Sequence, residues 1–333
     1  MYIINNNANA LGVDHMSKVE NYSFKSSDDE QTTIHAVKWS PDEGKPVAVL
    51  QLVHGMIEYI ERYDEFARFL ADRGFIVMGH DHIGHGDSVK SESDWGVFHT
   101  KNPDVTLVED MFTNYQIIKE QYPDIPYFIL GHSMGSYLLR EFLSMKAGEL
   151  QDVNGAIIMG TGTVPDKTLK AALAIANIIS VFHGPDYKSK FLANLSSGGA
   201  SYKDYDCTGK DPEKSWLSKN VESVTKYYKD PKDTFLFSVN GWKILYNSCR
   251  YDNNMENVKK MNMEIPVLFV SGSEDPVGDL GEGVKLAYKS FLDAGVKDCT
   301  MHLYENDRHE LLQETDREKI YSDLYDFMKE RMR

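Results

Sequence analysis

The chain is poor in cysteine and has no excess of positive charge. Cys207, Cys249 and Cys299 are odd in number and form no C-x-x-C pair, so the sequence predicts neither a disulfide framework nor a thiolate metal site. This usage is typical of a reducing compartment, and we expect a cytoplasmic protein. With 36 basic and 51 acidic residues, the formal net charge is −15, which would repel phosphate backbones. We therefore expect no nucleic-acid partner.

Long hydrophobic runs and leader segments are also lacking. The most apolar stretch, residues 171–182, contains Asn177 and Ser180 and is shorter than the ~20 residues that cross a bilayer, so we expect no transmembrane segment. The first residues have neither the basic start nor the continuous apolar core of a secretory signal. Residues 1–15 are rich in asparagine and aperiodic, and we interpret them as a disordered tail or a cloning remnant.

Enough apolar residues remain to build a large core, since 41% of the 333 residues are hydrophobic and 26% are charged. From Thr32 onward, short β-branched runs alternate with segments of helical period, which predicts an α/β fold with a mainly parallel sheet covered by helices on both faces. Strands are expected at residues 32–39, 47–53, 75–79, 127–130, 156–159, 267–270 and 300–304. Helices are expected at residues 58–73, 104–121, 134–146, 280–294 and 316–332.

This alternation stops between residues 164 and 263, where no convincing buried strand occurs. We interpret residues 164–263 as an inserted helical cap and residues 16–163 and 264–333 as the core. The segment 167–182 is apolar on nearly every side of a helix. Its residues Ile175, Ile178 and Ile179 could line an acyl-binding channel, or the whole helix could be packing core, and both interpretations remain open.

The sharpest local pattern is Gly131-His132-Ser133-Met134-Gly135, which follows an apolar run and precedes a helical segment. A serine between glycines on so tight a strand-to-helix turn adopts strained dihedrals and presents its hydroxyl clear of the sheet. A catalytic nucleophile at Ser133 is therefore the leading hypothesis, and an ordinary glycine-rich turn is the alternative.

A serine hydroxyl needs a general base and a group that orients the base. In this arrangement the acid follows a late strand and the histidine follows the next one. Glu274 and Asp275 follow the strand expected at 267–270, and His309 follows the strand expected at 300–304. We predict that His309 is the base and Asp275 the acid, with Glu274 as the competing carboxylate.

Acyl transfer also needs donors for the oxyanion, which backbone N–H groups supply best. We assign the N–H of Met134, just after the nucleophile, and the N–H of Met56, in the turn that follows the strand expected at 47–53. His54 precedes Gly55 in the same turn, and we interpret it as a structural residue that holds the turn by hydrogen bonds.

His80, His82 and His85 have the density of metal ligands, but the alternation of side chains at a strand end and the nearby glycines disfavour a shared site. His309-Glu310 begins an H-E-x-x-H pattern, yet Gln313 stands where the second histidine belongs. The chain also lacks the G-x-x-x-x-G-K-[ST] and G-x-G-x-x-G patterns. We therefore expect no metal and no cofactor.

Taken together, these motifs resemble those of the α/β-hydrolase superfamily, more narrowly its monoacylglycerol lipase and lysophospholipase-like serine hydrolases. The resemblance covers residues 20–333 and rests on His54-Gly55-Met56 with Glu58 and Arg62-Tyr63, Asp81-His82-x-Gly84-His85-Gly86-x-Ser88, the Ser133 pentapeptide, Gly272-x-x-Asp275-Pro276 and His309. It implies a capped α/β-hydrolase fold that hydrolyses carboxylic esters of glycerol or related alcohols without a cofactor. Its relatives include peptidases and aryl-ester hydrolases, so it indicates the mechanism better than the substrate.

Two other functions remain open. An amidase or aminopeptidase with the same triad would need an acidic anchor for the substrate amine, for which Glu222 and Asp230 are candidates. A catalytically silent binding protein would not require the complete set of Ser133, Asp275 and His309. Dehalogenase and epoxide hydrolase chemistry is disfavoured because such relatives carry aspartate at the position of Ser133. The oligomeric state is not indicated by the sequence.

Overall fold

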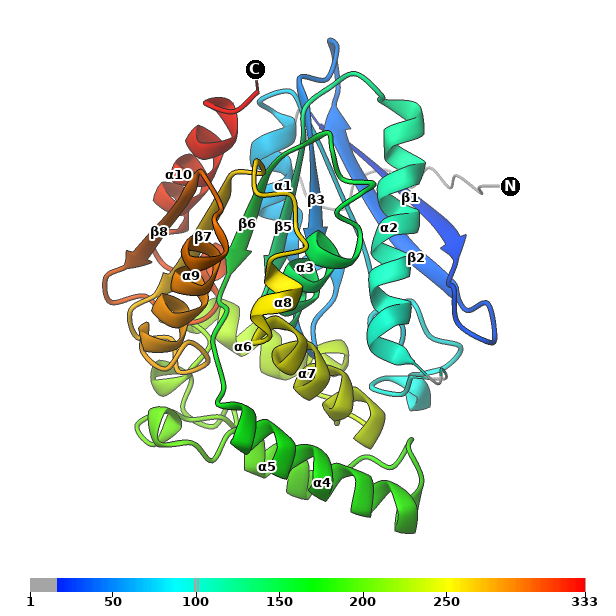
Figure 1. The fold of residues 1–333 in the computed structure, drawn as a ribbon, viewed down its shortest axis with the longest axis vertical. Coiled ribbons are helices and arrows are strands. Elements are labelled where there is room, and N and C mark those ends of the chain that lie inside the picture. The colour runs from blue at the N-terminus through cyan, green and yellow to red at the C-terminus, as the bar shows by residue number, and fades with distance from the viewer. Residues whose placement is uncertain (1–16, 99, 101, 333) are drawn as a thin grey trace.

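The computed structural model describes residues 17–98, 100 and 102–332 of the chain, so the tail expected at residues 1–15 lies outside the described residues. Within the described part, eight strands form one sheet in the order β1-β2-β4-β3-β5-β6-β7-β8 (Figure 1). The strands are β1 (Ser17–Lys25), β2 (Thr33–Pro41), β3 (Ala48–Val53), β4 (Phe75–His80), β5 (Tyr127–His132), β6 (Val153–Met159), β7 (Val267–Gly272) and β8 (Cys299–Tyr304).

The sheet from β4 to β8 is parallel, and β1 and β2 join its edge in antiparallel pairs. Every residue of β3, β4 and β5 is buried, as is typical of strands covered on both faces. The mainly parallel sheet that the sequence predicts is thus confirmed. Strand β1, which the sequence did not predict, pairs along its whole length with β2.

The helices cover both faces of this sheet. They are α1 (Asp64–Ala71), α2 (Pro103–Gln121), α3 (Met134–Met145), α4 (Asp166–His183), α5 (Lys190–Ser196), α6 (Val221–Lys229), α7 (Val239–Asp252), α8 (Met255–Val258), α9 (Glu282–Ala294) and α10 (Arg317–Lys329). Val49 of β3 packs in the core beneath α2, α3 and α9, whereas its neighbour Leu50 packs in the core beneath α1 and α10. The helix expected at 58–73 is instead a short 3-10 helix, η1 (Ile60–Tyr63), followed by α1.

Between β6 and β7 the chain forms the helices α4 to α8, which lie across the ends of the parallel strands and beside the sheet (Figure 1). Helix α4 packs on α7, and its buried residues are Leu169, Ala172, Leu173 and Ala176. Helix α7 packs in turn on α3, so the insertion shares its core with the sheet.

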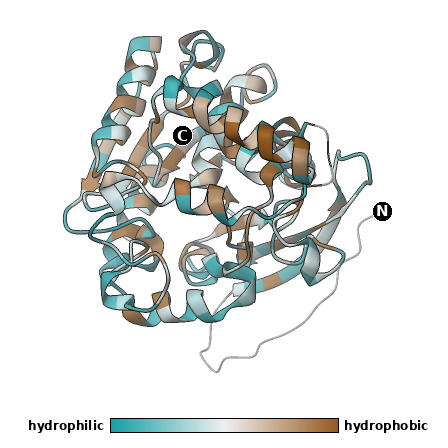
Figure 2. Cartoon of the chain, turned by 90° about the horizontal axis from the view of Figure 1, so that it is seen from below, coloured by the Kyte–Doolittle hydropathy of each residue, from teal (hydrophilic) through white to brown (hydrophobic). Residues whose placement is uncertain are grey.

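The opposite face of α4 is apolar and exposed. Ile178, Val181 and Phe182 are 59%, 82% and 78% exposed, and Phe191 of α5 is 59% exposed. Figure 2 views the molecule from this end, where hydrophobic segments lie among hydrophilic ones. Among the described helices, none combines the length and apolar character needed to cross a membrane.

Candidate active site

Ser133 occupies the sharp turn between β5 and α3. Its backbone has φ 53° and ψ −120°, a conformation that a residue with a Cβ rarely adopts. A Cβ on Gly131 would lie 2.3 Å from the carbonyl oxygen of Gly135, and one on Gly135 would lie 2.1 Å from that of Val53. Both flanking glycines are therefore required, because any larger residue would push α3 away from β5 and β3.

His309 and Asp275 form a buried pair after the last two strands. The Nδ1–H of His309 donates to Asp275 Oδ2 at 3.0 Å, and the two side chains are 2% and 0% exposed. Asp275 also accepts hydrogen bonds from Ser271 Oγ at 3.0 Å and from the N–H of Val277 at 2.9 Å. Burial alone would raise the pKa of Asp275, but His309 and these two donors hold it below its ordinary value.

The competing carboxylate lies elsewhere. Glu274 is 37% exposed, and its Oε2 pairs with Lys219 Nζ at 3.0 Å. Between the two acids that the sequence offered, the structure brings Asp275 to His309 and turns Glu274 toward solvent. The reason is local, because the backbone N–H of Glu274 donates to the carbonyl of Asp307 while Asp275 faces Ser271.

The imidazole of His309 lies close to two other rings. Trp216 lies 5.0 Å away at an interplanar angle of 31°, and His132 lies 4.7 Å away at 43° (distances between ring centroids). A Cβ on Gly160, whose φ is 60°, would lie 3.1 Å from His309 Cε1, so a larger residue there would crowd the ring. The sequence analysis missed Trp216, because no local motif connects it with residues about ninety positions further along the chain.

The turn assigned to the oxyanion lies directly beside Ser133. A Cβ on Gly55 would lie 2.9 Å from the Cβ of Ser133, so the turn before Met56 approaches the nucleophile closely. Met134 is the first residue of α3 and is buried. Both expected donors thus belong to segments that flank Ser133. Their action on a substrate remains a proposal.

Glu58 holds the oxyanion turn in place. Its Oε1 accepts hydrogen bonds from the N–H of Gly55 at 2.5 Å, from Tyr63 Oη at 3.0 Å and from His132 Nδ1 at 3.0 Å. Burial opposes ionisation, but His132 and Arg62 lower the pKa of Glu58 to about 2. His132 also donates through Nε2 to the carbonyl of His309 at 3.2 Å.

Arg62 extends this arrangement to the His309 loop. Its guanidinium donates to Glu58 Oε2 at 2.9 Å and to both carboxylate oxygens of Glu310 at 2.7 and 2.9 Å. Asp233 lies 3.5 Å from Arg62 Nε. All four side chains are at most 10% exposed. One buried charge cluster therefore joins the oxyanion turn to the residue after His309.

The histidines near the end of β4 have structural partners. His54 Nδ1 donates to the carbonyl of Gly55 at 2.8 Å, and His54 Nε2 accepts the N–H of His82 at 2.9 Å, which confirms the structural interpretation of His54. His82 Nε2 donates to the carbonyl of His54 at 3.1 Å, and His85 Nδ1 donates to that of Ile83 at 3.0 Å. In the described part of the chain, these histidines do not form a group of three whose possible ligand atoms all lie within 4.8 Å of one another.

The other residues singled out from the sequence lie in the insertion. Ile175 and Ile179 are half-buried and pack against the core cluster, whereas Ile178 points outward. Glu222 is exposed and pairs with Lys226 at 2.8 Å. Asp230 accepts hydrogen bonds from Tyr59 Oη and from the N–H of Lys232. Their roles toward a substrate remain predictions.

The geometry is suited to acyl transfer. A strained serine, a buried imidazole–carboxylate pair and two backbone turns meet at the ends of β3, β5, β7 and β8. These are the parts that nucleophilic attack on a carbonyl requires: a hydroxyl, a base held in one tautomer and donors for the oxyanion.

Comparisons with known proteins agree with this arrangement. The model of the family described as "Serine aminopeptidase, S33" matches residues 44–316. The monoglyceride lipase of Mus musculus is 27% identical over 283 residues, which cover 83% of this chain and 79% of the lipase. A thermostable carboxyl esterase from Bacillus coagulans, solved with glycerol, is 25% identical with a TM-score of 0.82 and covers 95% of this chain and 99% of its own. A monoglyceride lipase variant from Saccharomyces cerevisiae shares the fold, with 17% identity, a TM-score of 0.72 and coverages of 93% and 96%.

Proposed function

This chain belongs to the serine aminopeptidase S33 family, and on that premise we propose that it hydrolyses monoacylglycerols and related single-chain esters through Ser133, His309 and Asp275. It is a serine ester hydrolase, as its likeness to monoglyceride lipases and to a carboxyl esterase indicates. The observation that carries the proposed mechanism is the buried hydrogen bond between His309 and Asp275, formed beside the Ser133 turn. The names of the relatives support the substrate class.

In the proposed reaction, His309 Nε2 takes the proton of Ser133 Oγ as that oxygen attacks the ester carbonyl. The N–H groups of Met56 and Met134 stabilise the oxyanion of the tetrahedral intermediate. The C–O bond to the alcohol then breaks, and the alcohol leaves with the proton from His309. Water hydrolyses the acyl-enzyme by the same steps, so that the fatty acid is released and Ser133 is regenerated.

Asp275 supports the base in two ways. Its Oδ2 accepts a hydrogen bond from the Nδ1–H of His309. This fixes the proton on Nδ1 and leaves Nε2 unprotonated, so that Nε2 can take the proton of Ser133. Its carboxylate, held ionised by three donors, offsets the charge of the imidazolium that forms. Protein groups fill every role in this scheme, so the proposed hydrolysis needs no cofactor.

An amidase or aminopeptidase is the second candidate, favoured by the description of the family model. It would need a free carboxylate near the site to bind a substrate amine. Asp230 is engaged with Tyr59 and with the start of the 3-10 helix η5 (Pro231–Asp233), and Glu222 is paired with Lys226. These contacts favour the esterase over the aminopeptidase.

We also propose that residues 164–263 act as the cap over this site, since Trp216 contacts His309 from that segment. The small-molecule ester would enter beneath it. Cys207, Cys249 and Cys299 are all free, which supports the proposal of a reducing, cytoplasmic compartment.

Labelling and hydrolysis test the proposal together. A fluorophosphonate probe should label Ser133, and Ser133→Ala should lose labelling and turnover while keeping its circular dichroism spectrum. Ser136→Ala is the matched control. It removes a neighbouring hydroxyl that donates a hydrogen bond to the carbonyl of Ser133, and the variant should still be labelled. A probe adduct on another serine would overturn the assignment of the nucleophile. A panel of monoacylglycerol, lysophospholipid, aryl ester and aminoacyl amide substrates distinguishes the esterase from the aminopeptidase.

A further inference from the structure

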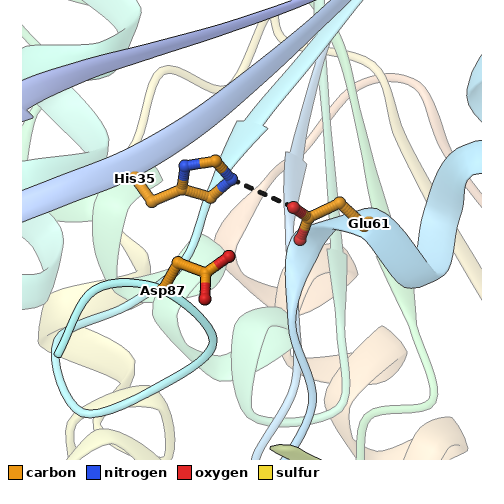
Figure 3. A group of neighbouring side chains, drawn as sticks. All are labelled: His35, Glu61 and Asp87. Carbon is orange, nitrogen blue, oxygen red and sulfur yellow. Dashed lines mark hydrogen bonds and ion pairs between the residues drawn. The ribbon is translucent and has the colours of Figure 1, made fainter. Parts of the chain in front are cut away.

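A second group of polar side chains gathers away from Ser133, where β2, the 3-10 helix η1 and the loop after β4 meet (Figure 3). His35, Glu61 and Asp87 each offer one ligand atom there, and these atoms all lie within 4.8 Å of one another. We propose that His35, Glu61 and Asp87 form a binding site for a divalent transition-metal ion of the zinc type. The proposal concerns a site apart from the catalytic residues and does not depend on the proposed function.

The spacing of the donors is close to that of metal ligands. His35 Nε2 lies 3.0 Å from Glu61 Oε1. Two ligands that each lie about 2.1 Å from one ion are separated by about 3.0 to 3.4 Å, so these two atoms already have a suitable spacing. The side chain of Asp87 is 52% exposed and can rotate toward the other two once it leaves its ion pair with Lys232 Nζ. Small side-chain movements suffice to complete the site.

The backbone around the three ligands is fixed by buried hydrogen bonds. Asp81 Oδ1 accepts the N–H of Ile60, next to Glu61, at 2.8 Å, and Asp81 Oδ2 accepts the N–H of Asp87 at 2.8 Å. Ser88 Oγ accepts the N–H of His35 at 2.9 Å and donates to the carbonyl of Asp81 at 2.8 Å. One buried carboxylate and one buried hydroxyl thus hold all three ligand-bearing segments. Such support by neighbouring groups is what orients the ligands of metal sites.

The charges of this place favour a cation. Glu61 Oε2 is buried and has no hydrogen-bond partner within the described part of the chain. The carboxylates of Glu61 and Asp87 meet here, and Lys232 Nζ contributes one ammonium 2.6 Å from Asp87 Oδ1. Two carboxylates thus exceed one ammonium, and although the Glu61 side chain is 36% exposed, leaving its buried Oε2 unpaired is costly. A divalent ion would satisfy Glu61 and offset that excess.

The donor set indicates which ions fit. One imidazole nitrogen and two carboxylate oxygens suit zinc and its neighbours cobalt and nickel, whereas magnesium and calcium prefer oxygen ligands alone. Asp87 and Lys232 also line an open groove of about 500 Å³, through which a hydrated ion can reach Asp87. Water molecules from this groove would complete the coordination.

A metal ion at this site would affect the contact between Lys232 and Asp87. Lys232 belongs to η5 in the insertion, and its ion pair with Asp87 joins the insertion to the core. An ion bound to Asp87 would compete with this ammonium and loosen the contact. Lys232 therefore opposes metal binding, which makes it a useful variant in the test.

Isothermal titration of the chelator-treated full chain with zinc chloride tests the site. We expect one zinc ion per chain, with the affinity lowered at least about tenfold in each of His35→Gln, Glu61→Gln and Asp87→Asn. His183→Gln removes an exposed histidine outside the cluster and should leave the affinity unchanged. Lys232→Met keeps all three ligands and removes the competing charge, so it should bind zinc more tightly than the wild type.

Three results would overturn the proposal: no stoichiometric zinc in the wild type, an unchanged affinity in His35→Gln, or an equal loss in His183→Gln. If the ligand variants unfold, Lys232→Met decides, since an unchanged or lower affinity there would show that zinc does not bind beside this ammonium. Cobalt substitution gives a further readout, because ligation by His35 should produce visible absorption bands that His35→Gln lacks.

Discussion

At the scale of single residues, Asp275 and Glu274 are adjacent carboxylates with different surroundings. Asp275→Asn should lower kcat about 10⁴-fold, because the amide no longer fixes the tautomer of His309 or offsets its charge. Glu274→Gln should retain kcat within a few-fold, since its side chain pairs with Lys219 near the surface. Steady-state kinetics of the two purified variants on one aryl ester measure the difference. Similar losses in both would contradict the choice of Asp275.

Arg62 allows a second test at this scale. Arg62→Met leaves Glu58 and Glu310 buried without their shared cation, which should cost about 3 to 5 kcal/mol of unfolding free energy. Since Glu58 holds the N–H of Gly55, kcat should also fall while KM changes little. Arg62→Lys keeps the charge but loses the two-pronged contact with Glu310 and should lie between the wild type and Arg62→Met. Urea unfolding and steady-state kinetics provide both readouts.

The matched control is the double variant Arg62→Met/Glu310→Gln, in which one of the stranded carboxylates is removed as well. Its stability should exceed that of Arg62→Met alone. A double variant that is less stable than Arg62→Met would show that the guanidinium acts mainly through packing and not through these charges.

Local motifs in the sequence predict single residues only where the motif itself contains them. Ser133 is predicted as the nucleophile from its flanking glycines, and Asp275 and His309 are predicted as its partners from their places after late strands. The contact between His132 and Glu58 joins residues 74 positions apart, and that between Arg62 and Glu310 spans 248 positions. No periodicity or spacing in the sequence predicts such pairs, because only the fold brings the segments together.

At the scale of elements, the buried strands were easier to predict than the edge strand β1. Strands β3, β4 and β5 are continuous apolar runs because both of their faces are covered. Strand β1 pairs on one side only, and only Tyr22 and Phe24 of its nine residues are buried. Its composition is therefore as polar as that of a loop, which is why the sequence did not indicate a strand at this place.

Helix α4 carries a prediction about acyl length. If the channel hypothesis holds, each buried substrate methylene contributes up to about 0.8 kcal/mol, so kcat/KM should rise over the first few carbons and then level off. Ile175→Lys should then penalise long acyl esters and spare acetates. Ile178→Lys should have a smaller effect, since Ile178 is 59% exposed. A chain-length series of aryl esters measures this, and a flat profile in the wild type would assign α4 to packing alone.

At the scale of the whole molecule, the buried histidines predict the response to acid. Burial lowers the pKa values of His54, His80, His82 and His85, those of His82 and His85 to about 4 and about 3. As the pH falls below 6.5, the unfolded chain takes up protons at these histidines that the folded chain does not bind. The contribution of these histidines to the free energy of unfolding is therefore present above pH 6.5 and is lost on acidification, by about 2 kcal/mol per histidine at pH 5.

Urea unfolding at pH 7 and pH 5 tests this prediction. Burial raises the pKa values of Asp81, Glu141 and Asp307 to about 7, so these carboxyls add stability on acidification and the test compares variants. Between pH 7 and pH 5, the free energy of unfolding of His85→Gln should change in favour of the folded state by about 2 kcal/mol relative to the wild type. His183→Gln, at an exposed position, should follow the wild type. A His85→Gln variant with the same pH dependence as the wild type would contradict the neutral, buried state of this ring.

The crossover from β6 to β7 through α7 and α8 determines which part of the insertion could be replaced by the corresponding segment of a relative. Because β6 and β7 are parallel neighbours, the chain that leaves β6 at one end of the sheet must travel its length before β7 begins. Helices α7 and α8 make this crossing against α3, and Trp242, Ile244 and Val258 belong to the same core as β5. They are thus the covering helices of an ordinary crossover, as indispensable as α3. An exchange between relatives within residues 164–238 must therefore keep the buried face of α4, because Leu169, Leu173 and Ala176 pack in the same core as α7, whereas the exposed face of α4 can change without opening the hydrophobic interior.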